Sequence, residues 1–260
     1  MKIVRFVDTD SEPLYGVLDG SFIHPLPDAP WFGMGLVGEP VPLAVVRLVE
    51  PLEAGRIFCV GLNYRAHAAE MNLALPERPM LFTKPSTTVV GPDAAIIYPR
   101  EAELVHHEAE LAVIIGREGR RIPEGAALDH VFGYTAANDV SERVIQKSEM
   151  ASGALLIAKG YDSFCPLGPV IETELDPGSL SISCRVNGAV RQNSNTADFI
   201  FSVPRIIACI SAAITLLPGD IILTGTPSGV GPIRPGDQVE VEIEGIGVLQ
   251  NSVVAEDQAA

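Results

Sequence analysis

Glycine and proline occur so often in this chain that few of its apolar segments are long enough to form a helix. There are 24 glycines and 21 prolines among 260 residues, and they separate short apolar runs along most of the sequence. Both residues interrupt helices and mark the turns between strands, so this spacing is typical of many short strands. The sequence therefore predicts a mainly β fold with a few helices, in the α+β class.

The expected strands and helices follow from the same spacing. Helices are expected at 64–71, 141–149 and 203–217, the last because its apolar residues recur at helical intervals. Asp19-Gly20 and Asn187-Gly188 are residue pairs that suit type I′ hairpin turns. Strands are expected at 2–7, 15–24, 56–61, 79–84, 108–116, 133–138, 181–186, 189–192, 221–224, 238–243 and 248–253.

Turn-forming residues concentrate between positions 25 and 53, where five prolines and three glycines precede residue 43. Such a stretch is typical of a connection between two folded units. We therefore predict a small N-terminal β unit with its linker at 1–53 and a larger domain at 54–260.

The net charge of the chain argues against nucleic acid as a partner. Eighteen Lys and Arg residues against 33 Asp and Glu residues give a net charge of −15, the wrong sign for binding nucleic acid through a basic face.

The longest apolar stretch, 206–217, is shorter than the ~20 residues that cross a bilayer. With no signal-peptide pattern at the start, the sequence predicts a cytoplasmic protein without membrane contact.

Glu108 and Glu110 form the first candidate site. They alternate along an expected strand and so project from one face of it, and the apolar run 111–115 that follows indicates burial. Two neighbouring carboxylates in a low dielectric repel each other unless a proton or a cation lies between them. A solvated strand edge is the alternative interpretation, and Glu101 with Glu103 repeats the same spacing.

Asp139 follows another apolar strand, and Ser141 after it could cap the next helix. A single Asp at this place can equally be a turn residue. Together with Glu108 and Glu110 it would offer three oxygen ligands, which suit Mg²⁺ or Mn²⁺ and leave positions open for water and a chelating substrate.

Three further residues could take part in chemistry. His67 and Glu70 are three residues apart on an expected helix, so they are either a general-base pair or a surface ion pair. Lys159, between an apolar run and Gly160, is either a cation in the site or an ordinary lysine at the end of a strand. The segment 68–79, with few residues to pack it, is expected to be a lid over the site.

Seven segments, taken in order, resemble the fumarylacetoacetate hydrolase family. They are 61–64 with His67 and Glu70, 82–86, 107–116, 133–141, 159–169, 186–192 and 218–227, within a resemblance that covers about 56–254. The resemblance implies a twisted β-roll, a homodimer and a Mg²⁺ or Mn²⁺ ion held by Glu108, Glu110 and Asp139. It also implies a water-activating His67–Glu70 dyad, with Lys159 facing the metal-bound oxygens. The substrate contacts that it implies are Lys84, Arg143, Gln146 and Thr226.

These implications predict an enzyme for small 2-oxo or 2,4-dioxo acids in catabolism. The leading prediction is hydrolytic carbon–carbon cleavage of an acylpyruvate. The alternative is isomerisation or decarboxylation, acting on 2-hydroxyhepta-2,4-diene-1,7-dioate or oxaloacetate-like acids of aromatic catabolism. A noncatalytic metabolite-binding homologue is a more remote alternative.

Overall fold

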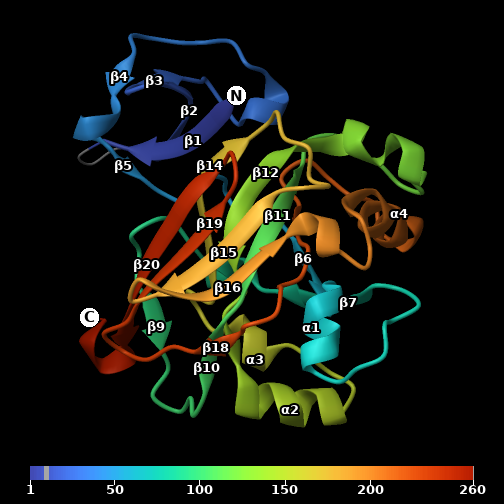
Figure 1. Ribbon diagram of the computed structural model, residues 1–260. Helices are drawn as coiled ribbons and strands as arrows, with labels where there is room; N and C mark the ends of the chain where they lie inside the picture. The colour runs from blue at the N-terminus through green and yellow to red at the C-terminus, as the bar shows by residue number, and fades with distance from the viewer. Residues whose placement is uncertain (9–11, 260) are drawn as a thin grey trace.

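A twelve-stranded sheet runs through the molecule (Figure 1). The computed structural model describes residues 1–8 and 12–259. The main path of the sheet is β4-β3-β2-β1-β14-β12-β11-β17-β6-β7, with β5 paired to β1 and β8 to β14. Its strands are β1 (Lys2–Val7), β2 (Leu14–Asp19), β3 (Phe22–Pro25), β4 (Val41–Pro42), β5 (Arg47–Leu48), β6 (Ile57–Gly61), β7 (Met80–Lys84), β8 (Val89–Val90), β11 (Ala109–Ile115), β12 (Val131–Asn138), β14 (Cys165–Glu172) and β17 (Ile221–Leu223).

Two smaller sheets complete the β structure. The five-stranded sheet has the order β16-β15-β19-β20-β9, and the three-stranded sheet has the order β13-β10-β18. One core cluster contains residues of β11, such as Leu111 and Val113, together with Ile182 and Val241 of the five-stranded sheet. The strands are β9 (Ile96–Tyr98), β10 (Val105–His107), β13 (Ser141–Glu142), β15 (Ser181–Val186), β16 (Ala189–Asn195), β18 (Gly231–Pro232), β19 (Gln238–Ile243) and β20 (Gly247–Ala255).

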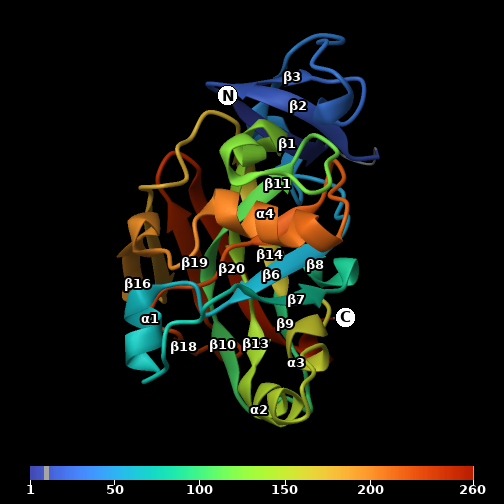
Figure 2. The ribbon, with the colours of Figure 1, turned by 90° about the vertical axis from the view of Figure 1, so that its right-hand side faces the viewer.

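The helices are short and few, which confirms the predicted mainly β class. They are α1 (Arg65–Glu70), α2 (Arg143–Ala151), α3 (Ile157–Gly160) and α4 (Val203–Ala213). In Figures 1 and 2, α2 and α3 lie at the end of the molecule opposite the N-terminal strands. Within the described residues, none of the helices has the length and apolar character that crossing a membrane requires.

The N-terminal strands continue the large sheet. β1 pairs antiparallel with β14, with Lys2 opposite Glu172 and Ile3 opposite Ile171. The amino group of Met1 also forms an ion pair with Glu172. Hydrogen bonds join strands from both sides of Glu53. The predicted division of the chain near Glu53 stays a prediction.

One predicted hairpin is confirmed and the other is displaced. Asn187 and Gly188 connect β15 to β16 with φ of +53° and +75°, the positive values of a type I′ turn. Asp19 instead pairs with Phe22, so Gly20 and Ser21 form the first turn. Only Gly20 of these two has a positive φ, +55°, so the prediction of a type I′ turn was wrong there.

Two predicted helix boundaries were also wrong. The helix expected at 203–217 ends at Ala213, because Ile214 is extended and Leu216 forms a β-bridge with Gly119. The helix expected from Ser141 begins at Arg143, and its cap is Glu142, whose carboxylate accepts the N–H of Ile145. Long-range pairing decides the first boundary, and a capping Glu, an uncommon choice, decides the second.

A buried asparagine connects three segments around the start of α1. The Asn63 side chain is fully buried, and its Nδ2 donates to Phe201 O at 3.1 Å and to Thr224 O at 2.7 Å. Its Oδ1 accepts the N–H of Phe201 at 2.8 Å. These bonds hold the β6–α1 connection against the end of β17, and so position α1.

We expect Asn63→Leu to lower the free energy of unfolding by about 3 kcal/mol or more, since three buried backbone groups would lose their partner. Urea unfolding followed by circular dichroism measures the change. Asn193→Leu on β16, where the side chain is exposed, is the matched control and should change stability by less than about 0.5 kcal/mol. Equal losses in the two variants would contradict the connecting role of Asn63.

Candidate metal centre

The pairing of β11 with β12 brings three acidic side chains together. Glu108 lies just before β11, Glu110 lies in it, and Asp139 follows β12. These strands are antiparallel with Ala109 opposite Asn138, so the beginning of one lies beside the end of the other. The three carboxylates are buried, with ligand oxygens within 4.8 Å of one another. This confirms the expectation that Glu108 and Glu110 point to one place.

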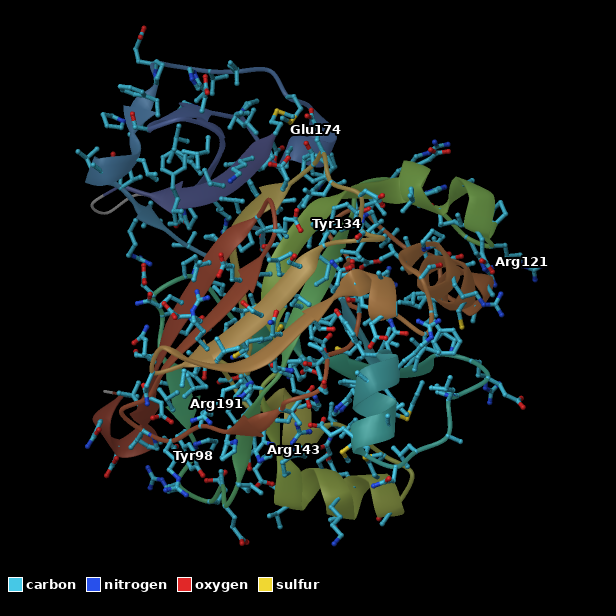
Figure 3. The ribbon with its side chains drawn as sticks, in the orientation of Figure 1. Tyr98, Arg121, Tyr134, Arg143, Glu174 and Arg191 are labelled. Atoms are coloured by element: carbon cyan, nitrogen blue, oxygen red, sulfur yellow. The ribbon has the colours of Figure 1, made fainter. Side chains whose placement is uncertain are left out.

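The site lies at the end of the sheet that carries α2. Figure 3 shows Arg143 at this end, whereas Tyr134, near the beginning of β12, lies toward the N-terminal strands. Glu101 and Glu103, the alternative acidic pair, are both exposed and do not belong to the buried cluster.

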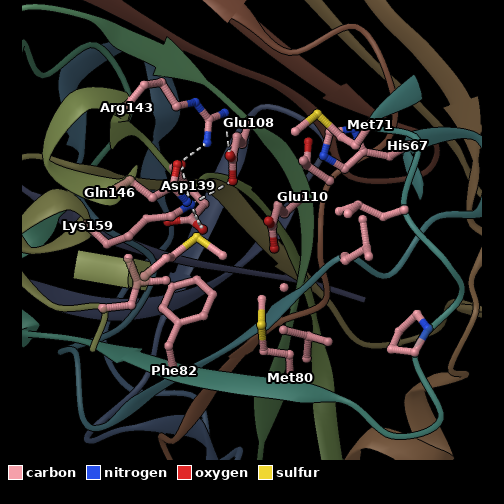
Figure 4. Close-up of a pocket in the computed structure, with 18 residues that line it drawn as sticks. His67, Met71, Met80, Phe82, Glu108, Glu110, Asp139, Arg143, Gln146 and Lys159 are labelled. Atoms are coloured by element: carbon pink, nitrogen blue, oxygen red, sulfur yellow. Dashed lines mark hydrogen bonds and ion pairs between the residues drawn. The ribbon is translucent and has the colours of Figure 1, made fainter. Parts of the chain in front are cut away.

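Three cations face two of the three carboxylates, and Figure 4 shows two of these cations, Arg143 and Lys159. Lys159 Nζ lies 2.7 Å from Glu108 Oε2 and 2.6 Å from Asp139 Oδ2. Arg143 Nη2 lies 2.6 Å from Glu108 Oε1, and Lys84 Nζ lies 2.7 Å from Asp139 Oδ1. Burial raises the pKa of Glu108, but the charges of Lys159 and Arg143 outweigh burial and hold that pKa well below its ordinary value.

Glu110 is the carboxylate without such a cation. Among the described residues no Lys, Arg or His forms an ion pair with it, and its Oε2 accepts the N–H of Gly225 at 2.7 Å. Burial, together with the charges of Asp139 and Glu108, raises the pKa of Glu110 well above its ordinary value. A divalent cation among the three carboxylates would supply the missing positive charge, and oxygen donors of this kind suit Mg²⁺ or Mn²⁺. The residues therefore fit a divalent metal.

The carboxylates open into a cavity of about 260 Å³ with two unlike sides. The polar side has His67, Arg143, Gln146, Lys159 and Thr226 beside the acidic groups. The other side is apolar and is lined by Met71, Leu73, Pro76, Met80, Phe82, Met150 and Leu155. Such a cavity can hold the carboxylate end of a small acid near the cations and its carbon chain against the apolar side.

His67 faces this cavity from α1 and is oriented by Glu70. Its Nδ1 lies 2.9 Å from Glu70 Oε2, and Glu70 Oε1 accepts the N–H of Gly229 at 3.0 Å. A carboxylate only accepts hydrogen bonds, so neutral His67 carries its proton on Nδ1 and has a lone pair on Nε2. This arrangement makes Nε2 available as a proton acceptor.

The structure places Lys84 differently from the other predicted substrate contacts. Arg143, Gln146 and Thr226 line the cavity, whereas Lys84 does not. Its buried ammonium instead binds Asp139 and Val140 O, so in this arrangement it holds a carboxylate of the metal centre. Met71, Leu73 and Pro76 of the predicted lid segment line the cavity, and the movement of that segment stays a prediction.

Lys159 is positioned by a residue that no sequence pattern indicated. Glu149, on α2, accepts the backbone N–H groups of Leu156, Ile157 and Ala158 at 2.8 to 3.1 Å. Partial burial raises its pKa, but these three donors outweigh burial and lower the pKa below the ordinary value of 4.5. One carboxylate therefore caps α3, the helix that carries Lys159. A single Glu on a helix is too common for this role to be visible in the sequence.

The buried acidic triad, with cations beside two of its carboxylates, defines a candidate site for a divalent metal. The family described as fumarylacetoacetate (FAA) hydrolase C-terminal matches residues 56–254. Residues 1–51 match a second family, which is described as "Rv2993c-like, N-terminal". The chain belongs to the fumarylacetoacetate hydrolase family. This confirms the family that the motifs of its sequence resemble.

Three relatives show the range of activities in this family. The crystal structure of 2-hydroxyhepta-2,4-diene-1,7-dioate isomerase from Mycobacterium marinum is 42% identical, with 99% of this chain and 100% of that chain covered and a TM-score of 0.90. The mitochondrial oxaloacetate tautomerase Fahd2a of Rattus norvegicus is 43% identical over 226 residues, 82% of this chain and 71% of its own length. Maleylpyruvate hydrolase from Sphingobium sp. SYK-6, solved with manganese(II) and pyruvate, is 33% identical, with 98% and 99% covered and a TM-score of 0.80.

We expect Glu110→Ala to abolish Mn²⁺ binding without lowering the melting temperature of the metal-free protein, because it removes one of three mutually repelling carboxylates. Isothermal calorimetry and thermal unfolding measure the two effects. Glu103→Ala, an exposed residue with the same sequence spacing, should leave both unchanged. Unchanged Mn²⁺ affinity in Glu110→Ala would place the metal elsewhere.

We expect Glu149→Ala to lower stability by about 1 kcal/mol at neutral pH, the usual cost of losing a helix cap. The pKa of Glu149 is depressed on folding, so the carboxylate stabilises the fold above the unfolded value of 4.5 and loses this effect as the pH falls through the folded value. The difference between variant and wild type should therefore shrink below pH 4.5. Glu118→Ala, on an exposed loop, is the control; thermal unfolding at pH 7 and below pH 4 measures both. A pH-independent difference would show that the charge of Glu149 is not what caps α3.

Proposed function

We propose that the protein is a divalent-metal-dependent isomerase of small 2-oxo acids. It would interconvert the enol and keto forms, or the double-bond isomers, of an oxaloacetate-like or 2-hydroxydienoate diacid. The observation that carries this proposal is the buried carboxylate triad, in which Glu110 forms no ion pair with a side-chain cation of the described residues. The similarity to an isomerase over nearly the whole chain and to a tautomerase over most of it supports isomerisation over hydrolysis.

Each part of the cavity has a role in such a reaction. Glu108, Glu110 and Asp139 would hold Mg²⁺ or Mn²⁺, which supplies Lewis-acid stabilisation of an enolate when it is bound. Arg143 and Gln146, hydrogen-bonded to each other at 2.7 Å, would bind the carboxylate of the substrate. Lys159 stays protonated in its ion pairs, since Asp139 and Glu108 outweigh the effect of burial and raise its pKa above the ordinary value.

Isomerisation needs a group that takes a proton from one atom of the substrate and returns it to another. Nε2 of His67 is free to do this, because Glu70 holds the proton of neutral His67 on Nδ1. A positioned general base contributes about 10² to 10⁴ in rate. The apolar side of the cavity would keep water away from the carbon chain, which favours proton return over hydrolysis.

Hydrolytic cleavage of an acylpyruvate is the second candidate, and the same dyad favours it. Nε2 of His67 could equally deprotonate a water molecule that attacks the distal carbonyl of the substrate. The maleylpyruvate hydrolase supports this candidate, although at lower identity and TM-score than the isomerase. The two candidates differ in the fate of one carbon–carbon bond, so product analysis separates them.

We expect the Mg²⁺-loaded protein to accelerate enol–keto interconversion of oxaloacetate, followed by ultraviolet absorbance, more than it cleaves any acylpyruvate. In D₂O the product should carry deuterium at C3. His67→Ala should lower this rate at least about a hundredfold, whereas His130→Ala, outside the cavity, should not change it. Faster release of pyruvate from an acylpyruvate than tautomerisation of oxaloacetate would overturn the isomerase proposal in favour of hydrolysis.

A further inference from the structure

A buried glutamine beside the metal centre has only one orientation that satisfies its neighbours. Gln192, on β16, is almost fully buried, and its Oε1 lies 3.0 Å from the backbone N of Ala109. A backbone N–H only donates, so the atom facing it must be the amide oxygen. On the other side, the amide nitrogen lies 2.9 Å from Pro227 O, which only accepts. Both contacts require the same orientation of the amide.

This orientation determines the hydrogen bonds of Thr226. Gln192 Nε2 lies 2.7 Å from Thr226 Oγ1, and because an amide nitrogen only donates, the hydroxyl oxygen must accept there. Thr226 Oγ1 also lies 2.9 Å from Ala109 O, an atom that only accepts. The single hydroxyl proton of Thr226 is therefore committed to Ala109 O, and one of its two lone pairs is committed to Gln192.

Thr226 lines the cavity and has one lone pair left. The hydroxyl can accept a hydrogen bond from a ligand but cannot donate one without breaking a buried bond. A ketone or carboxylate oxygen placed against it would bring two acceptors together with no proton between them, which is unfavourable in a low dielectric. A ligand O–H group would satisfy it.

We infer that Thr226 selects the enol form of the substrate by accepting a hydrogen bond from its C2 hydroxyl. Its neighbour Gly225 donates to Glu110, so Thr226 stands beside the metal centre, where the C2 oxygen of a chelating acid would lie. This inference rests on the proposed function, since it assumes a 2-oxo acid whose carboxylate end lies at the triad. Gln192 is a positioning residue, which acts through Thr226.

The same network predicts the tautomer of a second buried residue. His107 is fully buried and its Nδ1 lies 3.1 Å from Gln192 Oε1. Because this oxygen only accepts, His107 must carry a proton on Nδ1. Nitrogen-15 NMR of the metal-free protein distinguishes the two tautomers of a neutral histidine. The Nε2–H tautomer of His107 would reverse the orientation of Gln192 and overturn the inference without any ligand.

The ligand test compares two acids of the same skeleton and charge, lactate with a C2 hydroxyl and pyruvate with a C2 ketone. Calorimetry on the Mn²⁺-loaded protein gives the ratio of their dissociation constants. Thr226→Val keeps the shape of the side chain but removes the hydroxyl. It should weaken the binding of lactate about fivefold more than the binding of pyruvate, the factor expected for the loss of one neutral hydrogen bond. Thr226→Ser should keep the ratio of the wild-type protein.

The ratio separates this inference from general loosening of the site and from the proposed function. A loosened cavity would weaken both acids alike, so parallel weakening, or no change of the ratio, in Thr226→Val would overturn the role of Thr226. Failure of oxaloacetate interconversion with the ratio changed as expected would overturn the isomerase proposal and leave the acceptor role standing. Interconversion of oxaloacetate with an unchanged ratio would overturn the role of Thr226 and leave the isomerase proposal standing.

Discussion

The arrangement of the site depends on placing three carboxylates in a dry part of the protein. Glu108 and Asp139 are tolerated there because Lys84, Arg143 and Lys159 lie within ion-pair distance. These cations come from β7, α2 and α3, so the charge balance requires three separate segments to meet at the junction of β11 and β12. Glu110 has no ion pair with a cation in the part of the chain that the structure describes, which is why the site suits a divalent ion.

Backbone and amide hydrogen bonds hold the segments that deliver these charges. Asn63 fixes the connection to α1, Glu149 caps α3, and Gln192 joins β11 to the loop after β17. Asn63 and Gln192 each satisfy two or more buried backbone groups, and Glu149 satisfies three backbone N–H groups at the start of α3. A change at any of these residues would move a functional side chain without removing it, so these positions connect the stability of the fold to the chemistry of the cavity.

The cavity has a charged side at the acidic triad and an apolar side. In the proposed function, the acidic triad and the cations would bind the carboxylate end of a small 2-oxo acid, whatever the rest of the molecule. The reaction of the rest of the molecule would then depend on His67 and on how much water the apolar side admits. Solved structures similar to this chain include both an isomerase and a hydrolase.

The sequence by itself determined the class of fold, many of the strands, the Asn187-Gly188 hairpin and the acidic triad, because these depend on local alternation, turn chemistry and a short motif. It did not predict β14, although this strand lies inside the large sheet between β1 and β12. It also indicated His67 with Glu70, which are close together along one helix. The end of α4, the place of Lys84 behind Asp139, and the roles of Glu149 and Gln192 were decided only by tertiary structure. These features are contacts between residues far apart in the chain, such as Gln192 with Ala109 or Leu216 with Gly119. A hydrogen bond of that kind has no period or spacing in the sequence, since the fold alone brings its donor and acceptor together.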